Sequence, residues 1–525
     1  MPVTSEEAKR RELLPEHELL REIRGEQGCV SIEVAYEPRP DYARQTARLI
    51  DRGRLGTWIE SNREAAILCS DVTMGVNAAR MRAEGTAEVR AGQILHVSVS
   101  YSRNGPAVVP PLGPMARRRM DGTVAWWRAW SQRCSYAGPY RDAVMRSLLV
   151  LKLLSYAPSG AFIAAPTTSL PEVTGGVRNW DYRYCWLRDA SFTMRALLGL
   201  GYEEEAAAFC SWLLDTTRLS WPKLRVLYDV YGGTRHRQQQ LSHLRGFAGS
   251  RPVRIGNDAQ CQLQLDVYGE LLDAVSHFLL ERGHSLDGDT RRMLAGLGRT
   301  VCDDWQSADE GIWEMPNGRF QHTYSKVMCW VALDRLLELN EAGKLQVPVA
   351  KLQAARDSIR SCVEGRGFSS ELGSYTRTLD GSDVDASLLL LPLYGYVEPK
   401  SRRMRSTVEQ VLRRLGCGPF VLRYEAGLDG LPGSEGGFGI ASFWAVQALA
   451  RAGRLSKAVS LFEQLLGYAN DVGLYAEQFD PDNGEPLGNY PQAFTHVGLI
   501  NAALVLEELQ AGRQEAARVT SEART

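Results

Sequence analysis

The chain has 525 residues, more than a single small domain uses, so we expect one large domain and a smaller one. Hydrophobic residues make up 44% of it and charged residues 23%, which is enough for a sizeable core in an ordinary globular protein. The net charge is -1 and no long run of one sign occurs, so the composition gives no indication of a nucleic-acid or membrane-surface partner.

The ten cysteines are scattered and lack CxxC spacing. Cys210, Cys261 and Cys329 fall within apolar helical patterns, which is typical of reduced, buried thiols and not of a disulfide framework. The first residues are charged and contain no apolar segment of the kind that directs secretion, and no stretch is long and apolar enough to span a bilayer. We therefore expect a cytoplasmic protein; the sequence leaves its oligomeric state open.

The N-terminal part shows two patterns. Residues 1–27 are highly charged with a few interspersed leucines, which predicts a short surface helix and a loose tail. After them apolar residues alternate with polar ones, as in Val30, Ile32 and Val34, which is the period of a half-buried strand. Residues 28–103 are therefore predicted to form an antiparallel, β-sandwich-like domain.

The rest of the chain is predicted to be helical. Residues 104–138 begin with a run rich in proline and glycine, which indicates a linker. After it the apolar period is that of helices, and we expect them to begin near residues 140, 187, 203, 258, 289, 321, 347, 384, 402, 436, 455 and 492. Residues 139–512 thus predict one large, mainly α-helical domain, and 513–525 a polar tail. No repeat of fixed length is visible, which argues against a solenoid.

One stretch differs from the rest, Asn179-Trp-Asp-Tyr-Arg-Tyr-Cys-Trp-Leu-Arg-Asp189, which holds two residues each of Trp, Tyr, Arg and Asp. Buried Arg and Asp are rare unless they are paired, and Trp and Tyr need partners for their polar atoms. Flat aromatic faces beside charged hydrogen-bonding groups suit a pyranose ring and its hydroxyls. A buried ion-pair network at the start of a helix would use the same residues, so composition alone leaves both interpretations open.

The pattern Tyr-x-Tyr-x-Trp-x-Arg-Asp, from Tyr182 to Asp189, resembles the signature of glycoside hydrolase family 15, the glucoamylases and related α-glucosidases and trehalases. The resemblance extends from about residue 28 to about residue 510. It implies an (α/α)6 barrel of six helical hairpins with a smaller N-terminal antiparallel β-sandwich. The family's sandwich usually has further strands before this point, so we expect this one to be shortened.

Two glutamates have the local context of an acid and a base, since glycoside hydrolysis needs two carboxyl groups flanking one bond. Glu314 follows Trp313 directly, and a carboxyl group desolvated against an indole holds its proton, as a general acid must. Glu477 lies among Tyr475 and Gln478, which can orient a water for a general base. Any single glutamate is more often a solvated loop carboxylate. Both loops, however, are similar to the family's acid and base loops, which implies catalytic roles and cleavage with inversion.

Further residues are predicted to bind the sugar. Arg188 and Asp189 match the family's pair that grips the non-reducing-end glucose, although Asp189 would also suit the free amides of the next helix. The resemblance assigns Tyr182 to the attacking water and Trp186 to stacking. The other predicted substrate contacts are Gln264, Asp266, Trp313, Lys326, Arg423, Glu435, Trp444, Tyr475 and Gln478. Among these, Gln264 and Asp266 also suit buried, satisfied polar groups, and Trp444 an ordinary core.

These features predict an inverting exo-α-glucosidase that releases β-glucose from a disaccharide or short oligosaccharide. The acid and base do not decide between trehalose and an α-glucan. The loop from Tyr228 to Gly233 departs from related sequences, so we expect it to alter the second sugar subsite. The alternatives are an α-glucoside phosphorylase and a non-catalytic carbohydrate-binding protein. No metal-ligand spacing and no phosphate-binding loop is visible, so we predict neither a metal nor a cofactor.

Overall fold

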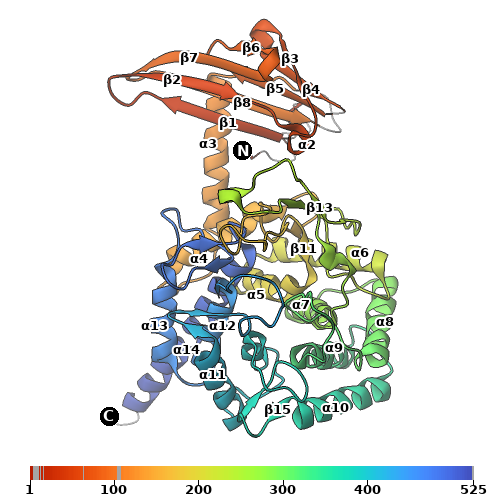
Figure 1. The fold of residues 1–525 in the computed structure, drawn as a ribbon. Helices are drawn as coiled ribbons and strands as arrows, with labels where there is room; N and C mark the ends of the chain where they lie inside the picture. Colours follow the sequence, from red (N-terminus) through yellow and green to blue (C-terminus); the bar gives the residue numbers. More distant parts are fainter. Residues whose placement is uncertain are drawn as a thin grey trace. The chain divides into compact units, whose positions relative to one another are not determined.

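The computed structural model describes residues 1–525 except 4–6, 8–10, 12, 16, 63, 103–107 and 523–525, and it leaves out the side chains of 282 and 513–522. The chain forms two compact units, Met1–Arg133 and Cys134–Thr525. The long strands belong to the first unit and most helices to the second, as Figure 1 shows. No helix in the described part of the chain is long and apolar enough to cross a membrane.

The N-terminal unit contains two antiparallel sheets that enclose a common core. The larger sheet has the strand order β1-β8-β5-β4-β3 and the smaller one β2-β7-β6. Leu49, Ile59 and Leu68 of the larger sheet share one buried cluster with Ala83 of the smaller, as the predicted sandwich requires. The strands are β1 His17–Arg24, β2 Cys29–Tyr36, β3 Arg48–Asp51, β4 Thr57–Ser61, β5 Glu64–Ser70, β6 Gly75–Asn77, β7 Arg82–Arg90 and β8 Ile94–Ser102.

Within residues 1–27, where we predicted a short surface helix and a loose tail, His17–Arg24 is instead strand β1, which pairs along its whole length with β8. Glu18 of this strand is buried and accepts hydrogen bonds from Ser98 Oγ at 2.7 Å and from Arg119 Nη2 at 3.0 Å. The leucine spacing that indicated a helix could not reveal a partner strand so far along the chain. The sheet region therefore begins before residue 28.

Two polar segments that we predicted to lack regular structure contain helix. Within the expected linker lies α3 (Pro114–Ser131), which begins with a proline, where the missing amide costs no helical hydrogen bond. At the other end of the chain, α14 (Ala493–Glu522) extends through residues 513–522, and 523–525 lie outside the described residues. The linker was predicted from the proline- and glycine-rich run at its start, which does not describe the residues after it. The tail was predicted from its polar composition, which an exposed helix and a loop have in common.

The C-terminal unit is a ring of helices in two layers (Figure 1). The inner layer closes through successive contacts of α5, α7, α9, the 3-10 turn η6, α12 and α14, which returns to α5. The outer layer consists of α4, α6, α8, α10, α11 and α13, each packed on an inner element. This is the predicted (α/α)6 arrangement. The bounds are α4 Arg141–Leu154, α5 Ala190–Gly199, α6 Glu203–Ser220, α7 Asp266–Arg282, α8 Gly288–Asp304, α9 Thr323–Glu341, α10 Val349–Arg366, η6 Ala386–Leu390, α11 Arg402–Leu415, α12 Gly439–Arg451 and α13 Leu455–Leu466.

The predicted helix starts agree with these bounds at most positions, and two differ. Near 384 the inner element is the 3-10 turn η6, where the side chain of Asp385 accepts the amide of Ser387 at 2.6 Å. Near 258 a short 3-10 turn, η5 (Asp258–Cys261), comes first, and α7 begins only at Asp266. In both places a polar side chain accepts a backbone amide and caps a tight turn. The spacing of apolar residues, from which we predicted the helix starts, gives no information about such a cap.

Long loops lead from the outer helices into the inner ones. The loops that precede α5, α7, α9, α12 and α14 all contribute residues to one pocket. The helical barrel therefore acts as a scaffold for these loops, and the pocket lies where the loops meet the first turns of the inner helices.

Candidate active site

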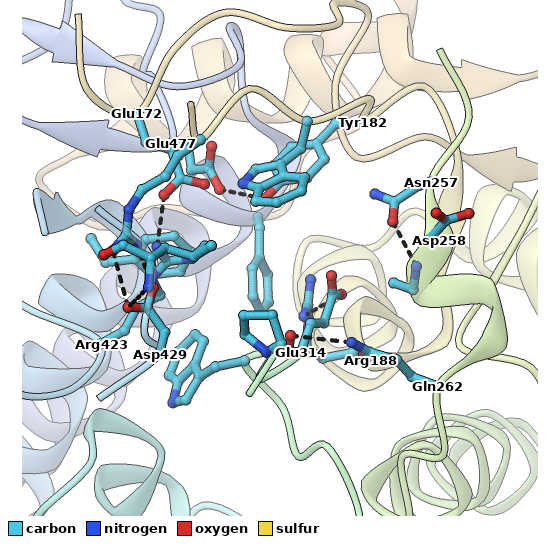
Figure 2. A pocket seen from close by; sticks show the side chains of 18 of the residues that line it. Glu172, Tyr182, Arg188, Asn257, Asp258, Gln262, Glu314, Arg423, Asp429 and Glu477 are labelled. Atoms are coloured by element: carbon cyan, nitrogen blue, oxygen red, sulfur yellow. Dashed lines mark hydrogen bonds and ion pairs between the residues drawn. The ribbon is translucent and has the colours of Figure 1, made fainter. Parts of the chain in front are cut away.

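The pocket at the ends of these five loops is shown in Figure 2. Its volume of about 220 Å³ is smaller than the roughly 300–1,000 Å³ of typical drug-sized sites, so it favours a small ligand. Both predicted catalytic residues, Glu314 and Glu477, line it from different loops. The lining also includes Glu172, Arg178, Trp180, Tyr182, Arg188, Gln238, Asn257, Asp258, Gln262, Trp313, Arg423, Tyr424, Asp429, Phe438, Gln492 and Phe494.

Glu314 is held by two residues of the Asn179–Asp189 motif. Its Oε1 accepts a hydrogen bond from Trp186 Nε1 at 2.6 Å and one from Arg188 Nη1 at 3.2 Å. The same guanidinium nitrogen donates to the carbonyl of Ile312 at 2.7 Å, which fixes the backbone of the Glu314 loop. We expected this carboxyl group to contact the indole of its sequence neighbour Trp313. The indole that donates a hydrogen bond to it is that of Trp186.

The backbone of Glu314 is in the left-handed region, with φ of 59°, which is uncommon for a residue with a side chain. Gln262 Nε2 donates to the carbonyl of Glu314 at 3.1 Å, and Gln262 is itself held by Gln264 Nε2 at 2.9 Å. Gly311 also has positive φ, 69°, and a Cβ there would lie 2.6 Å from the ring of His322. Strain that is supported in this way by its surroundings is typical of functional residues.

Glu477 is only 1% exposed. Its Oε1 accepts a hydrogen bond from the hydroxyl of Tyr182 at 2.7 Å. Its Oε2 packs against Gly488, where a Cβ would lie 2.4 Å from that oxygen, so only glycine leaves room. Burial, together with the nearby carboxylate of Glu172, raises the pKa of Glu477, and the Arg423 guanidinium opposes this in part. A carboxylate with a raised pKa is a better proton acceptor, as a general base requires.

Two buried arginines organise the side of the pocket next to Glu477. Arg423 Nη2 donates to Glu172 at 2.8 Å, and Arg423 Nε forms a close ion pair with Glu435. Arg178 pairs with Glu435 at 3.0 Å and with Asp429 at 2.7 Å. We call Glu172, Asp429, Glu435 and Glu477 together the carboxylate cluster. Breaking one of these buried pairs would leave an uncompensated charge, so the arrangement fixes this side of the pocket.

Tyr182 and Trp186 join the two halves of the site. Their rings pack edge to face with centroids 5.3 Å apart, while Tyr182 holds Glu477 and Trp186 holds Glu314. One short segment of chain thus contacts both carboxyl groups. Two carboxyl groups presented to one small pocket can serve as the acid and the base of glycosidic bond cleavage.

Residues 138–504 match the family described as Glycosyl hydrolases family 15. The chain belongs to that family. It is 38% identical over 503 residues to the trehalase of Mycolicibacterium smegmatis, covering 93% of this chain and 74% of the relative. It is 33% identical over 479 residues to the trehalase of Thermoplasma acidophilum, covering 91% and 81%. A solved bacterial glucoamylase complexed with acarbose shares the fold, with a TM-score of 0.64, 13% identity and coverage of 86% and 73%. The protein is a glycoside hydrolase.

Eight of the predicted substrate-binding residues of this family 15 enzyme fall into two groups. Tyr182, Arg188, Trp313 and Arg423 line the pocket, and the indole nitrogen of Trp313 donates outward to Asp385 at 2.8 Å. Behind them lie residues that hold the lining, namely Trp186 on Glu314, Gln264 on Gln262, Glu435 on Arg423 and Gln478 on Glu172. The motif therefore contributes residues that line the pocket, Tyr182 and Arg188, and one that holds a lining residue in place, Trp186.

Asp189 forms an ion pair with Arg188 just before α5, as the ion-pair interpretation of the motif expected. It is absent from the described residues that line the pocket, and although it precedes α5, its side chain makes no capping bond that the described part of the chain shows. Its Oδ1 accepts from Arg188 Nε at 3.3 Å. Burial raises the pKa of Asp189 to about 6, against the opposing charge of Arg188. Asp189 thus holds Arg188, and its predicted contact with the sugar stays a prediction.

Lys326 corrects a prediction, because its amine does not reach the pocket. Its Nζ donates to the carbonyls of Trp305 and Ser307, at 2.7 and 2.5 Å. The side chain is fully buried, and burial lowers the pKa of Lys326. These two carbonyls lie at the end of α8 and just beyond it, so Lys326 closes that helix and ties it to α9.

Trp444 and Tyr475 pack in the core and are not among the described residues that line the pocket. Trp444 is buried in α12 and stacks on Phe192 with ring centroids 5.6 Å apart. Tyr475 is buried and its hydroxyl donates to the carbonyl of Leu466 at 3.3 Å. Both aromatic rings fill the interface between the inner layer and its neighbours, the alternative that was left open for Trp444.

Asp266 is the first residue of α7 and is not among the described residues that line the pocket. It is fully buried, and neither of its carboxyl oxygens has a hydrogen-bond partner in the described part of the chain. Burial and the neighbouring Asp309 raise the pKa of Asp266 to about 7, although Arg188 opposes them. The prediction of a direct sugar contact is therefore corrected to a buried group behind the site.

The loop from Tyr228 to Gly233, which we expected to alter the second sugar subsite, forms a tight turn outside the pocket lining. Asp229 Oδ1 accepts the amides of Tyr231 and Gly233, both at 2.8 Å, which closes a tight turn. Residues 228–233, all of them described, are absent from the pocket lining. The residues from the next part of that loop, Gln238, Asn257 and Asp258, line the pocket instead.

Several lining residues were missed by sequence reasoning. Glu172 and Arg178 lie just before the motif, and Trp180 lies within it, so closeness to the motif was an available signal. Gln262 opens the same run of residues as Gln264, and only the path of the chain decides which of the two faces the pocket.

Proposed function

We propose that this glycoside hydrolase is an inverting, exo-acting α-glucosidase that hydrolyses α,α-trehalose, with Glu314 as general acid and Glu477 as general base. The observation that carries the proposal is the motif's contact with both carboxyl groups, through Trp186 on one side and Tyr182 on the other. The choice of trehalose is supported by the two trehalases that match most of this chain at 38% and 33% identity.

In the proposed reaction Glu314 donates its proton to the glycosidic oxygen as the bond from that oxygen to the anomeric carbon breaks. Glu477 takes a proton from a water, whose oxygen forms the new bond to the anomeric carbon from the opposite face. One water is consumed, one glucose leaves as the β anomer, and the other keeps its α configuration. An inverting enzyme needs room for this water, so we expect the two carboxyl groups to lie about 6.5–9.5 Å apart.

Arg188 is proposed to bind hydroxyls of the glucose that is cleaved. It lines the pocket, and its guanidinium is held in place by the carbonyl of Ile312, by Glu314 and by Asp189. A charged donor that is already fixed loses little freedom when it binds a sugar. Asn257, Asp258 and Gln262 belong to another loop and are proposed to contact the second glucose.

The test combines stereochemistry with specificity. Proton NMR at early times should show α- and β-glucose in equal amounts from trehalose, whereas a retaining enzyme would release only the α anomer. We expect kcat/KM to be higher for trehalose than for maltose, isomaltose or soluble starch. A preference for starch over every disaccharide would overturn the proposed substrate and leave a glucoamylase-like enzyme.

The catalytic roles are tested by Glu314→Gln and Glu477→Gln. Each should lower kcat by about 10²–10⁴-fold, the usual contribution of a general acid or base. Glu364→Gln is the matched control, because Glu364 accepts from Tyr375 at 2.9 Å and from Arg403 at 2.5 Å away from the pocket lining. Full hydrolysis by Glu477→Gln would exclude Glu477 as the base.

We also propose a cytoplasmic location. All ten cysteines are free thiols, which is the state that a reducing compartment maintains. Fractionation of cells that express the protein from its own gene, followed by a trehalose hydrolysis assay, tests this, and activity confined to the medium or envelope would contradict it.

A further inference from the structure

We propose that Glu172 is the partner carboxylate of the catalytic base, a positioning residue that acts through Glu477 and sets the pH range in which Glu477 accepts a proton. This inference rests on the proposed role of Glu477 as general base. Glu172 matched no catalytic pattern in the sequence, and its place in the pocket comes from the structure alone.

The two oxygens of Glu172 have different surroundings. Oε2 accepts two hydrogen bonds, from Arg423 Nη2 at 2.8 Å and from Gln478 Nε2 at 2.9 Å. Oε1 is buried without a donor among the described residues, although the residue is only 2% exposed and lines the pocket. A buried acceptor without a donor is costly. A protonated Glu477, which lies on the same side of the pocket, would be a donor for this oxygen.

The backbone brings the loops of Glu172 and Glu477 together. The amide of Gly488 donates to the carbonyl of Pro171 at 2.8 Å, and the Cα of the same glycine faces Glu477 Oε2. Gln478, the residue after the base, holds the side chain of Glu172. Figure 2 shows the side chains of Glu172 and Glu477 on the same side of the pocket.

The charges on this side of the pocket do not balance. The carboxylate cluster contributes four acids, whereas Arg178 and Arg423 contribute two cations, and each arginine is already paired with Glu435. Fully ionised, the cluster would carry a net charge of two negatives in a buried place, which is strongly unfavourable. Uncompensated negative charge in a buried place favours the protonated form of a carboxyl group beside it.

Glu477 is the member of the cluster that this imbalance affects most directly. The groups that face it are Glu172, Arg423, the hydroxyl of Tyr182 and the amide of Asn489. Burial and the charge of Glu172 raise the pKa of Glu477, and Arg423, Tyr182 and Asn489 lower it. Glu172 is thus the neighbour that makes the base hold its proton more strongly, and it has no other evident partner for its free oxygen.

The test is the pH profile of kcat/KM for trehalose in wild type, Glu172→Gln and the control Glu364→Gln. The base must be ionised to act, so activity is lost as the pH falls through its pKa. Removing the charge of Glu172 lowers that pKa, and the acid limb of Glu172→Gln should move to lower pH by about one unit, with a lower plateau. Glu364→Gln should keep the wild-type limb. A Glu172→Gln limb that stays at the wild-type position overturns the inference.

Two further measurements keep the test decisive if Glu172→Gln does not fold. Arg423→Gln removes the cation that opposes Glu172, so its acid limb should move to higher pH; an unmoved limb counts against the inference. A wild-type limb at or below about 4.3, the ordinary value for glutamate, would overturn it without any variant. The assignment of the base fails separately, namely if Glu477→Gln remains active.

Discussion

The indole nitrogen of Trp186 donates a 2.6 Å hydrogen bond to Oε1 of Glu314. Trp186 is buried in the short strand β11 (Cys185–Trp186), which pairs with β12 (Leu227–Tyr228). The position of the donor is therefore set by backbone pairing between two loops. Trp186 therefore holds the carboxyl group of Glu314, and the stacking that the family resemblance implied stays a prediction.

Trp186→Phe should lower kcat/KM for trehalose by about 10- to 100-fold, since a hydrogen bond to a charged group contributes roughly 1.5–3 kcal/mol. The ring volume is largely kept, so the loss comes from the missing N–H donor and a less fixed Glu314. Trp212→Phe is the matched control, because Trp212 is also buried and its indole nitrogen has no partner in the described part of the chain. Equal kinetics for the two variants would show that Trp186 only fills space.

Tyr182→Phe should reduce kcat and move the acid limb of the pH profile to higher pH. The hydroxyl of Tyr182 donates to Glu477 and lowers the pKa of Glu477, so its loss makes the base hold a proton at higher pH. The direction is opposite to that expected for Glu172→Gln. Tyr228→Phe is the control, since Tyr228 bonds Ser220 at 2.6 Å outside the pocket. A Tyr182→Phe limb that moves to lower pH would contradict this reading of the hydrogen bond.

The sequence indicated the site where chemically unusual residues lie close together along the chain. Tyr182, Trp186 and Arg188 fall within seven residues, and their density distinguishes the motif from a core helix. The neighbours of Glu314 and Glu477 suit an acid and a base, but a single loop glutamate is more often solvated, so the family resemblance was needed to favour catalytic roles. The barrel followed from apolar periodicity and from the resemblance, whereas β1 depends on a partner strand that periodicity cannot detect.

The sequence did not predict the direction in which a side chain points in the folded protein. Lys326 and Arg423 look alike in sequence, each a basic residue within an apolar stretch next to a candidate loop. Arg423 faces carboxylates in the pocket, whereas Lys326 faces backbone carbonyls at a helix end. Glu172 was missed for the same reason, since its role follows from Arg423 and Gln478, which are distant in sequence.

Lys326→Met should lower the free energy of unfolding by about 1–3 kcal/mol, because the carbonyls of Trp305 and Ser307 lose a buried donor. The KM for trehalose should stay within about twofold of wild type, since the amine does not reach the pocket. Urea unfolding and steady-state kinetics on the same preparation separate the two effects. A large rise in KM at unchanged stability would restore Lys326 as a substrate contact.

His496 predicts how stability depends on pH. Its ring is fully buried. Nε2 accepts the amide of Tyr475 at 3.2 Å, and Nδ1 lies 2.9 Å from Ser147 Oγ. Because Nε2 is an acceptor, the ring is neutral and carries its proton on Nδ1. Burial lowers the pKa of His496 to about 3. The unfolded chain therefore binds a proton below about 6.5 that the folded chain does not, and stability falls as the pH falls.

For this single residue the loss between pH 6.5 and 5.5 is about 1 kcal/mol. His496→Gln keeps an acceptor and a donor but does not titrate, so the stability difference between wild type and variant should shrink by that amount over the same interval. Urea unfolding at the two pH values measures it. His284→Gln, at an exposed position, is the control and should keep the wild-type pH dependence. A difference for His496→Gln that stays constant with pH would mean that His496 is charged, or exchanges protons freely, in the folded enzyme.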